Sequence, residues 1–224
     1  MMHPLFRDVA RHFLPNHTHY YYSRIKLTTD PLYVGVGEVL GGRSERLLDV
    51  GCGIGLLAHT LRAQGFKADY AGVDIDARKI ESARASSRRA GLTGLSFDIV
   101  DLAKDFPNHR GNVALLDIIQ FLPPEAQDAV LERAIASLSP GGILVIRTGL
   151  QRTGLRTRFT QNVDRLARLT RWMNVGPNRY PRREDLESRF AKHRMQPSFT
   201  PLRARLPFEN WLICAERPAA DRAA

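Results

Sequence analysis

A glycine-rich segment is the strongest chemical signal in the sequence. It runs from Asp49 to Gly55 and has glycine at positions 51, 53 and 55. Glycine permits a sharp backbone turn and lets the backbone approach a ligand closely. The phosphate-binding fingerprint of dinucleotide enzymes is G-x-G-x-x-G, and the G-x-G-x-G spacing here does not fit it. The segment therefore predicts a ligand-binding turn unlike a dinucleotide site; a tight turn without a ligand is the alternative.

Alternating strands and helices must position this segment. Short apolar runs at 47–50, 70–73, 95–100, 112–116 and 143–146 predict strands, and the stretches 56–64, 77–90 and 124–138 predict helices between them. Such alternation, with nearly continuous apolar strands, indicates an α/β fold with a parallel sheet covered on both faces. Later helices are expected at about 159–173 and 183–193. Strand-like runs near 196–202 and 209–215, with a short connection, favour an antiparallel hairpin on the sheet edge.

The first 45 residues differ from the rest and predict a mostly helical lead-in. Apolar residues from Leu5 to Leu14 follow helical spacing, and Pro15 ends that pattern. The histidine- and tyrosine-rich run 17–22 follows, with its histidines expected in an exposed loop. Asp30 and Pro31 are expected to open another short helix.

Composition excludes several classes of protein. The chain has 224 residues, 43% hydrophobic and 25% charged, which predicts one substantial globular domain rather than a disordered or fibrous chain. Only two cysteines are present, which excludes a disulfide scaffold and a cysteine-rich zinc module. No apolar run of about 18 residues predicts a transmembrane helix, and the N-terminal residues lack the apolar segment of a secretory signal. We expect a cytoplasmic protein.

Charge is spread unevenly along the chain. The net charge is +10, and the residues after 150 hold 16 Lys and Arg against 7 Asp and Glu. A basic C-terminal third could attract nucleic acid, anionic lipid or an acidic protein. A solvated arginine-rich surface explains the same charge.

Several segments, taken in order, resemble the class I S-adenosylmethionine-dependent methyltransferases. Asp49 to Gly55 looks like motif I of that family, and the family's later landmarks are matched at 72–76, 99–102, 117 and 138–142. The resemblance implies a Rossmann-like, seven-stranded, mostly parallel sheet with an antiparallel C-terminal hairpin, helices on both faces and a small helical cap. It divides the chain into a lead-in or cap at 1–45 and a methyltransferase domain at 46–224, with a cap insertion at about 151–195.

The same resemblance implies S-adenosylmethionine as cofactor and assigns its contacts. The loop would pass beside the amino-acid end of the cofactor, and Asp49 would accept a hydrogen bond from its ammonium group. Asp74 would accept both ribose hydroxyls, and Ile75 would pack on the adenine. Asp101 would accept from the adenine amino group, and the Leu102 amide would face a ring nitrogen. The loop residues concerned are Gly51, Cys52, Gly53 and Gly55. Asp74 and Asp101 could instead be helix caps or turn residues.

The acceptor side is less clearly marked. Tyr20 and Tyr21 could surround the methylsulfonium through cation–π attraction, and Arg24 could pair with the cofactor carboxylate. His19 is a candidate base because imidazole titrates near neutrality. These side chains could equally pack the lead-in on the domain. Asp117 could serve the cofactor, the acceptor or a cap, and no metal site is expected.

Three functions compete. The leading hypothesis is methyl transfer to a small molecule, since the stretch 20–33 looks like that of small bacterial methyltransferases associated with aryl-polyene and fatty-acid-like pathways. That resemblance implies a phenolic or acyl acceptor, either free or bound to an acidic acyl carrier protein, which the basic third would suit. RNA or DNA methylation is disfavoured because 117–121 lacks the Asn/Asp-Pro-Pro-aromatic motif of nucleobase amino-methylases. The third is a non-catalytic S-adenosylmethionine-binding subunit.

Overall fold

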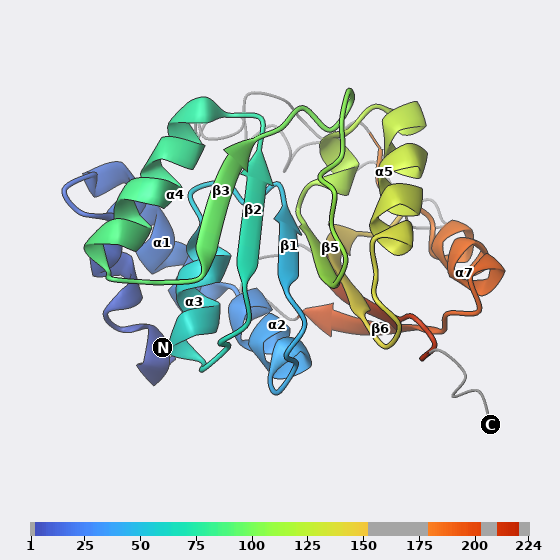
Figure 1. Ribbon diagram of the computed structural model, residues 1–224, viewed down its shortest axis with the longest axis horizontal. Coiled ribbons are helices and arrows are strands. Elements are labelled where there is room, and N and C mark those ends of the chain that lie inside the picture. The colour runs from blue at the N-terminus through green and yellow to red at the C-terminus, as the bar shows by residue number, and fades with distance from the viewer. Residues whose placement is uncertain (1–2, 152–178, 203–209, 220–224) are drawn as a thin grey trace.

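A seven-stranded sheet forms the centre of the molecule (Figure 1). The computed structural model describes residues 3–151, 179–202 and 210–219. The strand order is β3-β2-β1-β4-β5-β7-β6. The strands are β1 (Leu47–Val50), β2 (Tyr70–Asp74), β3 (Leu95–Ile99), β4 (Asn112–Leu116), β5 (Ile143–Gly149), β6 (Pro197–Leu202) and β7 (Asn210–Glu216). The pairs among β1 to β5 are parallel, whereas β7 is antiparallel to both β5 and β6.

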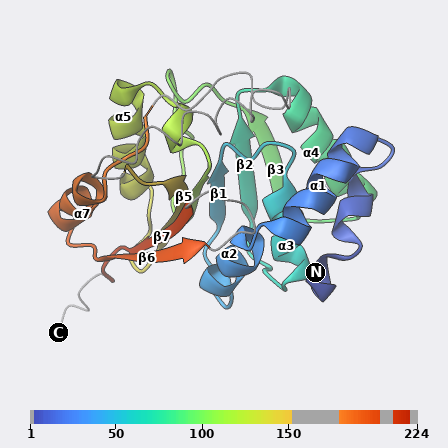
Figure 2. The same ribbon diagram turned by 180° about the vertical axis from the view of Figure 1, so that it is seen from behind.

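Helices cover both faces of this sheet, as Figures 1 and 2 show. The lead-in contributes α1 (His17–Thr29) and α2 (Leu32–Leu40). The crossover helices are α3 (Leu56–Ala63), α4 (Ala77–Arg89) and α5 (Pro124–Ala136), and α7 (Arg183–Lys192) precedes the final hairpin. Short 3₁₀ turns are η1 (Pro4–Phe6), η2 (Val9–Phe13) and η3 (Ile119–Phe121). The expected α/β, Rossmann-like sheet with an antiparallel C-terminal hairpin is therefore confirmed.

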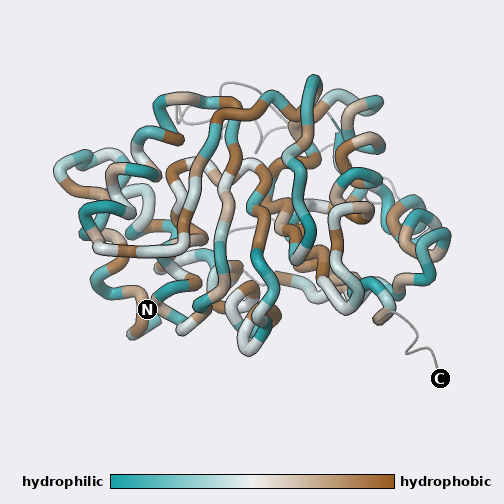
Figure 3. Tube along the Cα trace, in the orientation of Figure 1, coloured by the Kyte–Doolittle hydropathy of each residue, from teal (hydrophilic) through white to brown (hydrophobic). Residues whose placement is uncertain are grey.

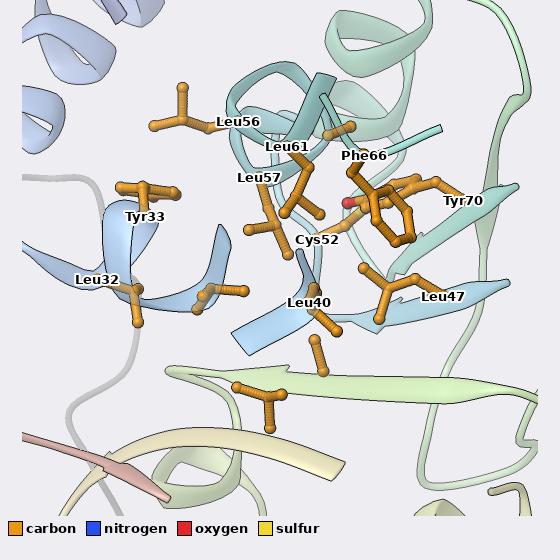
Figure 4. Close-up of a cluster of buried hydrophobic side chains, with 14 of the residues drawn as sticks. Leu32, Tyr33, Leu40, Leu47, Cys52, Leu56, Leu57, Leu61, Phe66 and Tyr70 are labelled. Carbon is orange, nitrogen blue, oxygen red and sulfur yellow. The ribbon is translucent and has the colours of Figure 1, made fainter. Parts of the chain in front are cut away.

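Two apolar cores lie on opposite faces of the sheet because successive side chains of a strand point to opposite faces. Leu47 packs with the cluster under α2 and α3, whereas Leu48 packs with the cluster under α5 and α7. Figure 4 shows the first cluster, in which Tyr33 and Leu40 of α2 face Leu57 of α3. In Figure 3 the central strands carry apolar colour, and polar colour gathers on the outer helices.

The lead-in differs from its expected form in two places. The segment from Leu5 to Leu14 forms η1 and η2 rather than one regular helix. The run 17–22, whose histidines were expected in an exposed loop, is the first half of α1. The reason is local, since the Asn16 side chain accepts a hydrogen bond from the His19 amide at 3.0 Å and caps the helix.

Candidate active site

All three glycines of the loop after β1 adopt left-handed backbone conformations. Their φ angles are +80° at Gly51, +57° at Gly53 and +78° at Gly55. Residues with a Cβ rarely adopt this region, so the alternate spacing reflects a backbone requirement. The Gly51 and Cys52 amides both donate to the carbonyl oxygen of Val73, at 2.7 and 2.9 Å. These bonds tie the loop to the end of β2.

Asp74 lies at the carboxyl end of β2 and holds the other side of the loop. Its Oδ2 accepts a hydrogen bond from the Gly53 amide at 2.9 Å, and its Oδ1 accepts one from the Asp76 amide at 2.9 Å. Each carboxylate oxygen can accept a further bond. Among the described residues, and apart from the chain neighbours of Gly53, no atom lies within 4 Å of the position that a Cβ on Gly53 would occupy. The neighbouring Ile75 is 66% exposed. An open backbone cradle, a carboxylate and an exposed apolar side chain fit an adenosyl ligand.

Asp49 lies beneath the loop, inside the core. It is 2% exposed, and its Oδ2 accepts a hydrogen bond from the Tyr70 hydroxyl at 2.5 Å. The pKa of Asp49 is raised to about 7, chiefly by burial. The Asp74 charge also raises it, whereas the Tyr70 hydrogen bond lowers it. The expected bond from Asp49 to a cofactor ammonium group stays a prediction.

We expect Tyr70→Phe to destabilise the protein more at pH 8 than at pH 5. The folded pKa of Asp49, about 7, lies above its unfolded value of 3.8, so folding favours the protonated acid and stability is lost as pH rises through this window. Removing the hydroxyl deprives the ionised carboxylate of a donor, which costs about 1.5–3 kcal/mol above pH 7 and about 1 kcal/mol below it. Urea unfolding at both pH values measures the difference. Equal losses at pH 5 and pH 8 would refute this account.

Cys52 fills a narrow space between the loop and β2. Its side chain is buried in the cluster of Figure 4, and burial raises the pKa of its thiol well above the usual range. A Cβ on Gly72 would lie 2.8 Å from the Cys52 Sγ atom. The structure thus gives Cys52 a packing role in the loop, and Gly72 allows the close approach.

The turn after β3 places Asp101 and Leu102 beside the same sheet edge. The amide of Val100 donates to the Asp74 carbonyl oxygen at 3.1 Å, which joins the ends of β2 and β3. Asp101 Oδ1 accepts from the Ala103 amide at 3.1 Å, so the side chain also shapes its own turn. Both Asp101 and Leu102 are partly exposed. Their assigned contacts with adenine stay predictions.

A cluster of charged side chains lies where β4 ends. Asp117 has a φ of +58°, and its carboxylate forms an ion pair with Arg147 of β5. Arg147 also contacts Asp30, which follows α1, at 3.2 Å, and Lys26 of α1 lies 3.2 Å from Asp30. Burial alone lowers the pKa of Arg147, but Asp117 and Asp30 raise it, and the net shift is upward. The cluster fastens the end of α1 to the sheet.

The candidate acceptor-side residues of α1 point in different directions. His19 Nδ1 lies 2.7 Å from the Ser82 hydroxyl of α4, and burial lowers the pKa of His19. The rings of Tyr20 and Tyr21 meet edge to face at 5.1 Å. Arg24 is exposed and donates to the Tyr20 hydroxyl at 3.2 Å. The structure therefore gives His19, Tyr20 and Arg24 partners on α1 or α4; their proposed roles toward ligands stay predictions.

Sequence reasoning missed several residues of this region. Tyr70 and Arg147 were not predicted as site residues, although they contact Asp49 and Asp117. Asp30, predicted only to open a helix, joins the same cluster through Arg147. One signal was available, because Arg147 follows four apolar residues in a strand that is buried throughout. A charged residue in such a strand needs a partner.

The surface of the protein also has two grooves. One groove of about 340 Å³ lies between α5 and α7, and another of about 540 Å³ lies beside the turn before β4. Over the described ranges, no group of three histidine, cysteine or acidic side chains could hold a metal ion. None of the described helices has the length and apolar character needed to cross a membrane. Most of the expected cap insertion, residues 152–178, lies outside the described residues.

The chain is similar to known methyltransferases. The family profile described as "Methyltransferase domain" matches residues 42–180. A ubiquinone biosynthesis O-methyltransferase of Psychrobacter cryohalolentis is 26% identical over 113 residues, which cover 49% of this chain and 42% of that protein. A ubiquinone biosynthesis O-methyltransferase of Brucella melitensis is 28% identical over 203 residues, which cover 78% of this chain and 73% of that protein. This chain therefore spans less than half the length of the first relatives that it matches.

A solved structure extends the comparison to nearly the whole fold. The magnesium protoporphyrin IX methyltransferase of Synechocystis, with bound S-adenosylhomocysteine, superposes with a TM-score of 0.66 over 94% of this chain and 93% of that one. Because the two sequences are only 16% identical, this likeness shows the fold alone.

The profile match covers more than half of the chain, so the chain belongs to the methyltransferase domain family. Its class is that of the class I S-adenosylmethionine-dependent methyltransferases, as the sequence indicated, and S-adenosylmethionine is the cofactor of that class.

Proposed function

We propose that this protein transfers a methyl group from S-adenosylmethionine to an oxygen of a small molecule. The observation that carries the cofactor half is the Gly53–Asp74 contact, which joins the glycine loop and the carboxylate of β2 into one cradle. The acceptor half rests on the O-methyltransferases among the relatives. A phenolic or acyl acceptor, free or bound to an acidic carrier protein, suits the basic C-terminal third of the chain.

We assign the cofactor contacts by position in this cradle. Asp74 would accept from the ribose hydroxyls, and Ile75 would cover one face of the adenine. Asp101 and the Leu102 amide would meet the adenine edge, and Gly51 to Gly55 would lie beside the amino-acid end. When bound, S-adenosylmethionine supplies an electrophilic methyl group. The chain's own task is then alignment of the acceptor, which alone can lower the barrier by several kcal/mol.

The lead-in, residues 1–45, would form part of the cap over this edge together with the segment 151–195. In support, α1 is fastened at one end to α4 through His19 and at the other to β5 through Asp30. An RNA or DNA acceptor and a non-catalytic cofactor-binding subunit are the competing proposals. A transfer assay with labelled S-adenosylmethionine, offering free phenols, carrier-bound acyl groups and RNA in parallel, separates all of them.

A thermal-shift titration tests the cofactor site first. We expect S-adenosylmethionine and S-adenosylhomocysteine, but not NAD, to raise the melting temperature. A ligand that binds only the folded chain adds roughly 2.7 kcal/mol at a hundredfold excess over its dissociation constant. Asp74→Ala should abolish the shift, whereas Asp98→Ala, on the exposed end of the neighbouring strand, should keep it. A shift with NAD alone would contradict the methyltransferase proposal and indicate a dehydrogenase site.

A further inference from the structure

The charge cluster at the end of β4 has a buried and an exposed half. The inner pair, Asp30 and Arg147, has side chains that are 7% and 8% exposed. The outer pair, Lys26 and Asp117, has side chains that are 27% and 32% exposed. The inner pair therefore fixes the arrangement, and the outer pair presents one positive and one negative group to solvent.

Two observations single out this cluster beyond its ion pairs. Asp117 is in the left-handed region, which is uncommon for a residue other than glycine and concentrates at functional sites. Its amide donates to the Arg147 carbonyl oxygen at 3.0 Å, so the conformation is held by backbone and side chain together. The Nε atom of Arg147 is buried and has no hydrogen-bond partner among the described residues. Such a group in a folded protein calls for an explanation.

The outer pair lies beside the cofactor cradle. Ile118, the next residue after Asp117, approaches the glycine loop so closely that a Cβ on Gly51 would meet its side chain at 3.1 Å. The strands that carry the two loops, β1 and β4, are neighbours in the sheet. An acceptor bound at the outer pair is therefore next to the place we assign to the amino-acid end of the cofactor.

The spacing of the outer pair suits one bridging oxygen. The Lys26 Nζ and Asp117 Oδ2 atoms are 3.9 Å apart, which is beyond hydrogen-bond distance. A single oxygen about 2.8 Å from both atoms closes the triangle, accepting from the ammonium group and donating to the carboxylate. Tyr22, a partly buried residue of α1, lies within electrostatic range of the same four charged side chains.

We propose that Lys26 and Asp117 are the acceptor-binding pair and that they select a neutral hydroxyl. A carboxylate would be repelled by Asp117, and an amine in its charged form would be repelled by Lys26, whereas a hydroxyl satisfies both. This inference rests on the proposed function, which it deepens by naming the acceptor group and the residues that hold it. It places Asp117 on the acceptor side of the site.

Three probes of one shape test the selection. Binding of 2-naphthol, 2-naphthoate and 2-(aminomethyl)naphthalene is measured by fluorescence, with and without saturating S-adenosylhomocysteine. We expect wild-type protein to bind the naphthol about tenfold more tightly than the other two, since one hydrogen bond to a charged group is worth about that much. Asp117→Asn should shift the preference toward the carboxylate, and Lys26→Met should shift it toward the amine. Asparagine tolerates the left-handed backbone, so the first variant keeps the turn.

Opposite shifts in the two variants distinguish binding from mere structural damage, which would weaken all three probes alike. Lys192→Met, on exposed α7, is the matched control and should behave as wild type. Equal binding of the three probes by wild-type protein, or parallel losses in both variants, would overturn the proposal. The preference of the wild-type protein for the naphthol tests the proposal even where a variant does not fold. Failure of S-adenosylhomocysteine to bind would count against the proposed function. The order of affinities for the three probes, measured without S-adenosylhomocysteine, would still test the role of Lys26 and Asp117.

Discussion

Arg147→Met is expected to lower the free energy of unfolding by about 3–5 kcal/mol, because removing one member of a buried ion cluster leaves its partners without compensation. Arg147 is 8% exposed on its side chain and pairs with both Asp30 and Asp117. Methionine keeps the apolar stem, so the loss reports the charge rather than a cavity. In a chain of this size the loss corresponds to a fall in Tm of roughly 10 °C. Urea unfolding and calorimetry measure it.

Two further variants test whether the loss in Arg147→Met comes from uncompensated buried charge. Adding Asp30→Asn and Asp117→Asn to Arg147→Met should restore part of the stability, because the uncompensated charges are then gone. Arg11→Met removes the exposed ion pair with Asp8, whose side chains are 72% and 76% exposed, and should change stability by less than about 1 kcal/mol. If Arg147→Met were as mild as Arg11→Met, the cluster would not fasten α1 to the sheet.

Acid should release the lead-in through His59. This histidine of α3 is 1% exposed, and its Nε2 lies 3.1 Å from the Ser86 hydroxyl, which itself donates to the Ala83 carbonyl oxygen. His59 Nε2 therefore carries the proton, and its Nδ1 accepts from His12 Nδ1 at 3.0 Å. Protonating His59 would set two N–H groups against each other. Burial, together with a smaller effect of nearby His12, lowers the pKa of His59 to about 3.

The sign follows from proton linkage. The folded pKa of His59 lies below its unfolded value of 6.5, so its contribution to stability is complete above pH 6.5 and is lost as pH falls toward 3. Each pH unit in this window costs about 1.4 kcal/mol, which amounts to about 3 kcal/mol at pH 4. Asp49 acts oppositely between pH 4 and 7, because its folded pKa is raised to about 7. The effect is therefore measured as the difference between variants.

His59→Gln should be less stable than the wild-type protein at pH 7, and the gap should shrink by about 3 kcal/mol by pH 4. His17→Gln changes an exposed histidine of the same lead-in and should follow the wild-type curve. Hydrogen exchange of residues 4–13 at pH 7 and pH 4.5 locates the released segment. A gap that is constant with pH would show that His59 does not govern the acid response.

Local patterns predicted the sheet and the glycine-rich turn after β1 well. Apolar runs of strand length and the helices between them depend on neighbouring residues, so they are visible in the chain itself. The glycines at 51, 53 and 55 predicted a sharp turn, and all three are left-handed in the structure, because glycine adopts that backbone freely. The lead-in was predicted less accurately. Helical spacing from Leu5 to Leu14 produced only 3₁₀ turns, since packing on α3 and α4 decides the conformation of so short a segment.

The partners of the polar side chains depended on tertiary structure. The sequence identified Asp49, Asp74 and Asp117 as chemistry-bearing carboxylates, but their contacts come from distant segments. Tyr70 reaches Asp49 from β2, and Arg147 joins Asp30 across 117 residues of chain. No local periodicity encodes such pairs, because they exist only once sheet register and helix packing bring the segments together. The sequence by itself therefore determined the class of protein and the glycine-rich turn, whereas the tertiary structure decided the charge cluster beside that turn.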